Sequence, residues 1–121
     1  MLKWLKKLSR AKSTFSDELY SILGFIPKKI ELYHQAFCHS SIEDQEYGNN
    51  ERLEFLGDAI FNAVITEYLF QKMEQKDEGT LTDFRSKMVS RKTLNLLAKK
   101  IKIDKMVRTN LGDKIPSSVY G

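Results

Sequence analysis

The sequence predicts an all-α fold, a bundle of helices within one domain. Apolar residues recur at intervals of three and four over several stretches, as they do along one face of a helix. Polar segments rich in Gly, Asn, Asp and Ser separate these stretches, and the alternation typical of strands never persists beyond a few positions. With 121 residues, of which 41% are apolar and 30% charged, the chain suits a single soluble domain with a modest core.

Residues 1–15 are predicted to form a basic N-terminal extension. Leu2, Leu5 and Leu8 lie near helical spacing among basic residues, which suits an amphipathic helix on a membrane surface or on RNA. A solvated extension is the favoured alternative. No run approaches the roughly 18 apolar residues of a membrane span, and no secretory-type apolar segment follows the basic start. We therefore expect no membrane partner. The single cysteine, Cys38, excludes an internal disulfide and makes a cytoplasmic setting the default.

Two helices are expected in the first half of the chain. The segment STFSDEL offers several N-caps and places acids where a first helical turn favours them. It predicts a helix over roughly residues 16–23 that ends at Gly24. From Ile30 to Cys38 the apolar spacing is helical again, and it runs into the polar loop HSSIEDQEYGNN.

The longest helix is expected over residues 51–73, after that loop. Asn49 or Asn50 is its predicted N-cap. QKDEG is a predicted turn, after which Thr80 or Thr82 caps the next helix.

Charge is segregated along the chain, although the net charge is only +4. Residues 43–83 carry eleven acids against three bases, whereas residues 85–108, which include the last predicted helix at about 92–100, carry nine bases against Asp104 alone. An acidic site beside a basic surface suits an enzyme that holds a metal and binds a polyanion. A solvated basic helix face is the alternative, and charge alone slightly favours it.

Three carboxylates share one stripe of the long helix. At about 100° per residue, Glu51, Glu54 and Asp58 fall on one face. Like charges three and four residues apart oppose helix formation by roughly 0.2–0.5 kcal/mol per pair. Partial burial is expected to add a desolvation cost. A divalent cation such as Mg²⁺ or Mn²⁺ would compensate both costs, because carboxylates favour hard ions.

The three acids differ in how strongly they indicate function. Glu51 falls in the first turn, where the helix dipole favours a carboxylate for structural reasons alone, so capping and function are evenly matched there. Glu54 and Asp58 are expected to lie too deep for that explanation, and a metal-binding or catalytic role is favoured for them. Further oxygen ligands are expected from another segment, because one helix rarely completes a metal site.

The same geometry predicts the core-facing side of this helix. Leu53, Leu56, Ile60 and Val64 fall opposite the acids. Because Phe55 and other apolar residues flank the stripe, the helix is apolar nearly all round. It is therefore expected at the centre of the bundle.

These residues resemble the signature of the ribonuclease III family of Mg²⁺-dependent endonucleases. NERLEFLGDA resembles its central motif, AFCHSS its upstream A-x-x-H-x-S element, and EGTLTDFRSKMVSRKTLNLLA its downstream E-G-x-L-T-x-x-R-S block. The resemblance covers roughly residues 16–121, which we take as an incomplete endonuclease domain.

The resemblance implies a helical endonuclease that acts as a homodimer and hydrolyses double-stranded RNA to 5′-phosphate and 3′-hydroxyl ends. It implies that Glu54 binds Mg²⁺, for which Mn²⁺ can substitute, and that Asp58 is a catalytic carboxylate close to the metal. Glu51 would be an accessory acid and Phe55 a dimer-interface residue. His39 and Ser40 would be structural, and the basic segment from Arg85 to Arg108 would contact phosphates.

One departure from the family pattern limits this expectation. The family completes its site with a second acidic pair, Asp and Glu three apart, on a later helix, and adds a double-stranded-RNA-binding domain. After Arg108 the only acid here is Asp113. We therefore expect a fragment that binds metal weakly and cleaves poorly or not at all. The alternative is a non-catalytic RNA-binding or dimerisation module on the same fold, which would not need Glu54 and Asp58.

Overall fold

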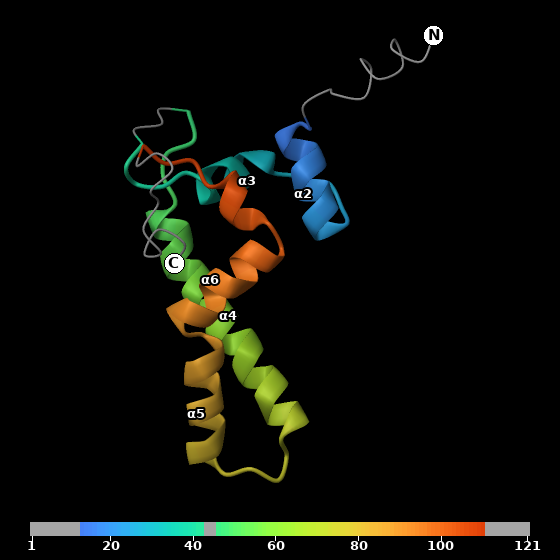
Figure 1. Cartoon of the computed structure of the whole chain (residues 1–121), viewed down its shortest axis with the longest axis vertical. Coiled ribbons are helices and arrows are strands. Elements are labelled where there is room, and N and C mark those ends of the chain that lie inside the picture. Colours follow the sequence, from blue (N-terminus) through green and yellow to red (C-terminus); the bar gives the residue numbers. More distant parts are fainter. Residues whose placement is uncertain (1–12, 43–45, 111–121) are drawn as a thin grey trace. The chain divides into compact units, whose positions relative to one another are not determined.

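The computed structural model describes residues 13–42 and 46–110, and these residues are helical (Figure 1). The only β-type pairing among them is an isolated parallel bridge between Cys38 and Arg108. This confirms the predicted all-α class. None of the described helices is long and apolar enough to span a membrane. In chain order the elements are α2 (Phe15–Leu23), α3 (Ile30–Ala36), α4 (Glu51–Lys72), α5 (Glu78–Met88), α6 (Arg91–Lys100) and a 3₁₀ helix, η1 (Ile103–Met106).

The chain divides into two units, residues 1–30 and residues 31–121. Helix α2 belongs to the first unit. Its N-cap is Thr14, whose hydroxyl accepts a hydrogen bond from the backbone N–H of Asp17, while the Asp17 carboxylate accepts one from the Thr14 backbone. This capping box satisfies donors that the first turn leaves unpaired. Gly24 ends the helix in the left-handed conformation, at φ 76°, as predicted.

Helix α5 begins earlier than the sequence predicted. Its N-cap is Asp77, whose Oδ1 accepts from the backbone N–H of Thr80 at 2.8 Å. The predicted caps, Thr80 and Thr82, are therefore wrong, and the last two residues of QKDEG are already helical. The reason is that Asp caps helices better than Thr, and Asp77 is the first strong cap in the turn.

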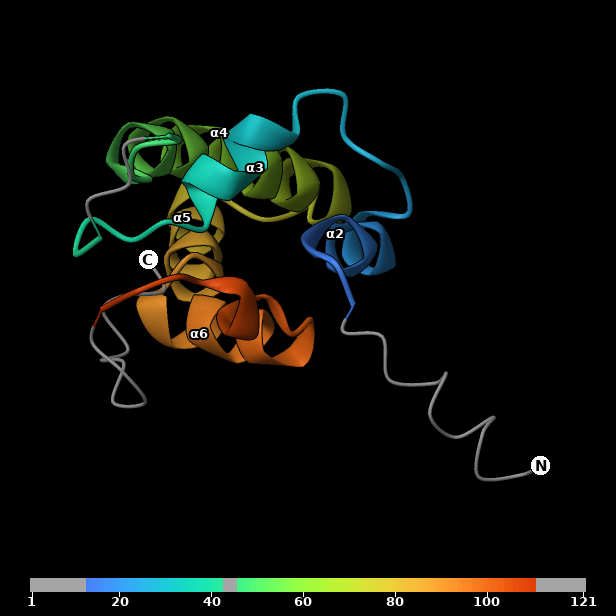
Figure 2. The same ribbon diagram turned by 90° about the horizontal axis from the view of Figure 1, so that it is seen from above.

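Helices α4, α5 and α6 form the framework of the second unit. Helix α4 packs against α5, α5 against α6, and α6 against η1. Seen from above, α5 lies between α4 and α6 (Figure 2). Leu69 of α4 and Ala98 of α6 are buried in this framework.

The predicted core face of α4 is wrong for three of its four residues, and only Leu53 is half-buried. Leu56, Ile60 and Val64 are 55%, 56% and 55% exposed, whereas the buried Leu69 lies on the same helical face as the carboxylates. The half-buried Ile65 lies near that face as well. A helix that is apolar all round has no distinct apolar side to show which face its neighbours will cover. Helix α5 covers the side that continues the acidic stripe.

Candidate functional site

The three acids stand exposed at the N-terminal end of α4. Glu51, Glu54 and Asp58 are all solvent-exposed, so the expected desolvation cost is absent. Exposure lets water screen the repulsion between like charges, which explains why the helix tolerates them. Both Glu51 and Glu54 belong to the first turn, where the positive end of the helix dipole favours carboxylates. The expectation that Glu54 lies beyond this turn was wrong. Only Asp58 lies outside the dipole's reach.

A neighbouring amide orients the Asp58 carboxylate. The side-chain Nδ2 of Asn62 donates to the Asp58 carbonyl oxygen at 2.9 Å and lies 3.4 Å from Asp58 Oδ1. Because the amide approaches only one carboxylate oxygen, the other stays available to a ligand.

The carboxylates offer the hard oxygen donors that Mg²⁺ prefers. However, no group of three or more His, Cys, Asp or Glu side chains in residues 13–42 and 46–110 is placed to hold one ion. The described part of the chain therefore offers a metal at most two such side chains at any one place.

The upstream motif ties two distant segments together. The Ser41 hydroxyl lies 2.9 Å from His39 Nδ1 and 3.1 Å from the Thr109 hydroxyl, and it accepts from the backbone N–H of Asn110 at 3.2 Å. The backbone N–H of Ser41 also donates to His39 Nδ1 at 3.1 Å, so that nitrogen acts as an acceptor. His39 is held by Ser41 through these contacts, in line with the structural role expected for it.

Backbone pairing reinforces this connection. The backbone N–H of His39 donates to Arg108 O at 3.0 Å, and that of Arg108 donates to Phe37 O at 2.7 Å. The backbone N–H of Asn50, the residue before α4, donates to Cys38 O at 2.9 Å. The upstream motif therefore fixes the point at which α4, with its acids, begins.

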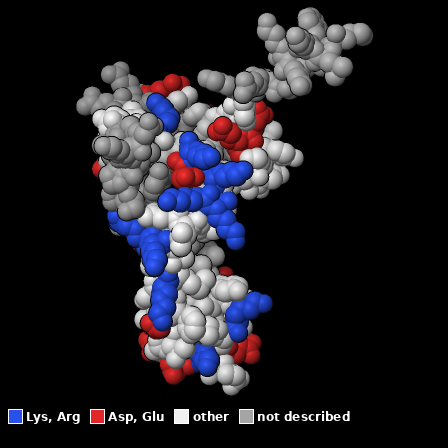
Figure 3. All heavy atoms as spheres, in the orientation of Figure 1, with Lys and Arg blue, Asp and Glu red and all other residues white. Residues whose placement is uncertain are grey.

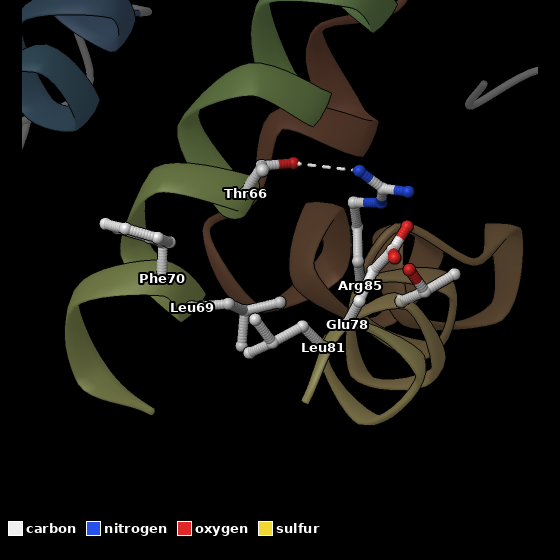
Figure 4. Close-up of a pocket in the computed structure, with 7 residues that line it drawn as sticks. Thr66, Leu69, Phe70, Glu78, Leu81 and Arg85 are labelled. Carbon is white, nitrogen blue, oxygen red and sulfur yellow. Dashed lines mark hydrogen bonds between the residues drawn. The ribbon is translucent and has the colours of Figure 1, made fainter. Parts of the chain in front are cut away.

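The downstream motif packs α5 against α4. Glu78, Leu81, Thr82 and Arg85 recur at helical spacing on α5, and Leu81 lies toward Leu69 of α4 (Figure 4). Arg85 Nη1 donates to the hydroxyl of Thr66 at 3.3 Å. With Thr66 and Phe70 these residues line a small cavity of about 170 Å³. The hydrogen bond between Arg85 and Thr66 was not predicted from the sequence.

Lys and Arg side chains gather over the surface formed by α6 and the segment after it (Figure 3). In α6, Arg91, Lys92, Lys99 and Lys100 are all exposed. This is the basic part of the chain that the charge pattern indicated.

Comparison with known proteins identifies the relationship. A family model described as ribonuclease-III-like matches residues 29–118. The chain belongs to the ribonuclease III family. The match spans the upstream motif, the acidic helix and the downstream motif. The matched segment begins at residue 29 and ends at residue 118. It does not test the predicted bounds of the extension (1–15) and of the domain (16–121), which stay a prediction.

Curated ribonuclease III relatives support this placement. The ribonuclease 3 of Zunongwangia profunda is 39% identical over 122 residues, which cover 97% of this chain and 50% of that protein. The ribonuclease 3 of Bacteroides fragilis is 52% identical over 93 residues, covering 74% of this chain and 32% of that protein. The chain thus spans half or less of the length of these relatives.

Solved structures confirm the ribonuclease III fold. Two structures of the nuclease domain of ribonuclease III from Campylobacter jejuni superpose with a TM-score of 0.76. They are 31% and 30% identical and cover 86% and 88% of this chain. The chain covers 75% of each, and one of them is described as flexible in a region involved in dimer formation.

Proposed function

We propose that this chain is the larger part of the nuclease domain of an endoribonuclease that hydrolyses double-stranded RNA. The observation that carries the proposal is the pair Glu54 and Asp58, exposed four residues apart on α4 in a member of the ribonuclease III family. The alternative, a non-catalytic RNA-binding or dimerisation module, gives no reason for an acid at Asp58, because the helix dipole does not favour a carboxylate at that depth.

Glu54 and Asp58 would hold Mg²⁺, or Mn²⁺ in its place, and Glu51 would be an accessory acid. When bound, the metal supplies an activated water and stabilises charge on the leaving 3′-oxygen, which yields 5′-phosphate and 3′-hydroxyl ends. Asn62 lies beside this site, with its amide bonded to the Asp58 backbone carbonyl at 2.9 Å and 3.4 Å from one carboxylate oxygen.

The proposed assembly is a homodimer that uses the acidic side of α4. Phe55 lies beside the acids and is 83% exposed, although a large aromatic side chain strongly favours burial. The related Campylobacter jejuni nuclease domain, described as having a region involved in dimer formation, supports a dimer. A cytoplasmic setting is also proposed, on the ground that a single cysteine, Cys38, forms no internal disulfide.

By itself, this chain is proposed to bind metal weakly and to cleave poorly or not at all. Mg²⁺ prefers an octahedral shell, and two carboxylates on one helix are few ligands for it. An assay of the chain with Mg²⁺ on duplex RNA tests this point. Robust cleavage that Asp58→Asn abolishes would contradict the weak activity while supporting the assignment of Asp58.

Metal-dependent stabilisation tests the site itself. Millimolar Mg²⁺ or Mn²⁺ should raise the thermal midpoint of the chain, because a ligand that binds only the folded state stabilises it. Glu54→Gln and Asp58→Asn should each remove that shift. Glu67→Gln, which neutralises another exposed acid of α4, is the matched control and should keep it. An equal shift in all four proteins would exclude Glu54 and Asp58 as the metal ligands.

A further inference from the structure

A basic hollow lies on the exposed face of α6, and the proposed catalytic chemistry does not use it. Its volume is about 440 Å³, and no acid lines it. At about 100° per residue its lining side chains fall within less than half a turn of the helix. We call this hollow the α6 groove; it is lined by Arg91, Lys92, Asn95, Leu96 and Lys99.

The cations of the α6 groove have no carboxylate partner in the described part of the chain. The ion pair found among the described residues joins Lys87 to Asp83 on α5, at 2.7 Å, and involves no residue of the α6 groove. The first turn of α6 contains no acid and carries Arg91 and Lys92, although the helix dipole disfavours cations there by roughly 0.3–1 kcal/mol. Folding alone therefore does not account for these charges, whereas a bound anion would neutralise them.

The dimensions and chemistry of the α6 groove suit a nucleic-acid backbone. Arg91 and Lys99 are eight residues apart, or about 12 Å along the helix at 1.5 Å per residue. Such a length meets more than one phosphate of a duplex, which carries a charge about every 1.7 Å of its axis. Between the cations, Leu96, 62% exposed, offers an apolar contact to the sugar.

A membrane surface fits the same face less well. A helix that lies on lipid needs a broad apolar face directed outward. The apolar side of α6 instead turns partly inward, with Ala98 buried, Leu94 half-buried and Leu97 42% exposed. Leu96 stands among cations on the exposed side.

We propose that the α6 groove binds the phosphate backbone of duplex RNA, with Arg91, Lys92 and Lys99 as the contacting cations. This inference rests on the proposed function and adds to it a specific binding surface. These contacts are independent of base sequence, so they position the RNA without selecting the site of cleavage.

Salt-dependent binding tests the α6 groove. The whole chain is titrated against a fluorescent RNA duplex of about 20 base pairs, in EDTA so that no cleavage occurs. Arg91→Gln/Lys99→Gln should weaken binding roughly tenfold at low salt and lower the slope of log K against log salt by about two. Lys72→Gln/Lys76→Gln removes the same charge from exposed positions outside the groove and should keep the wild-type slope.

Further variants and a second probe separate the outcomes. Arg91→Lys/Lys99→Arg retains the charge and should bind as the wild type does, which excludes misfolding as the cause of a loss. If the wild type binds duplex RNA and Arg91→Gln/Lys99→Gln binds it equally, the α6 groove proposal is overturned and the proposed function stands. If the wild type binds no duplex RNA, both are overturned. Binding of the chain to phosphatidylserine vesicles is measured as well. If vesicle binding depends on Arg91 and Lys99 and RNA binding does not, the groove proposal is overturned in favour of a membrane surface.

Discussion

At the scale of single residues, Asp58 carries the strongest indication of function. Glu51 and Glu54 gain from the helix dipole, so their presence has a structural explanation. Asp58 does not, and aspartate is also a poor helix former within a helix. Its contact with Asn62 offsets this cost only in part, because one of the two distances to the amide is a long 3.4 Å.

Asp58→Asn is therefore expected to stabilise the metal-free protein. Removing one like charge four residues from Glu54 should raise the free energy of unfolding by roughly 0.2–0.5 kcal/mol. Urea unfolding in EDTA measures this change, with Glu67→Gln as the control. With Mg²⁺ present the wild type should become the more stable of the two proteins, since only the wild type retains the Asp58 carboxylate proposed to bind the metal. A loss of stability in EDTA would show that Asp58 has a structural role instead.

At the scale of elements, the sequence predicted which segments are helical better than where each begins. Gly24 ends α2 as predicted, because glycine alone adopts the left-handed conformation at little cost. The start of α5 was misplaced because the segment QKDEG was taken as a turn in full, although its Asp77 is a better cap than Thr80 or Thr82.

The Asp77 cap makes the stability of α5 depend on pH. The hydrogen bond that the Thr80 backbone N–H donates to Asp77 lowers the pKa of this carboxyl below its ordinary value of 3.8. A lowered pKa in the folded state contributes stability above pH 3.8, and that stability disappears as pH falls through the folded value. Wild type should therefore exceed Asp77→Asn in stability near neutral pH and converge with it in strong acid.

Unfolding by urea at several pH values between neutral and strongly acidic conditions measures this convergence. Glu74→Gln, which removes a charge in the same turn without removing the cap, is the control. The gap in the free energy of unfolding between it and wild type should not follow the titration of Asp77. A gap between wild type and Asp77→Asn that stays constant over the whole range would contradict a charged cap.

At the scale of the whole molecule, α4 exposes apolar side chains on two sides. Phe55 stands beside the acids, and Leu56, Ile60 and Val64 lie on a separate face. The sequence predicted that α4 is apolar all round, but not which face its neighbours cover, because that depends on tertiary packing. Exposed apolar surface of this extent on a soluble domain is typical of a binding interface.

Paired truncations on α4 measure how much each face contributes to the fold. Leu69→Ala should lower the free energy of unfolding by about 2–5 kcal/mol, because Leu69 is only 4% exposed and its removal leaves a cavity. Ile60→Ala should cost less than about 1 kcal/mol, because the side chain is already half solvated and alanine is the better helix former. Urea unfolding at low protein concentration compares the two. Suppose that Ile60→Ala costs as much as Leu69→Ala. If this cost grows with protein concentration, the face of Ile60 is buried by a second copy of the chain. If the cost is equally large at every concentration, that face is buried within one chain, which contradicts its assignment as exposed surface.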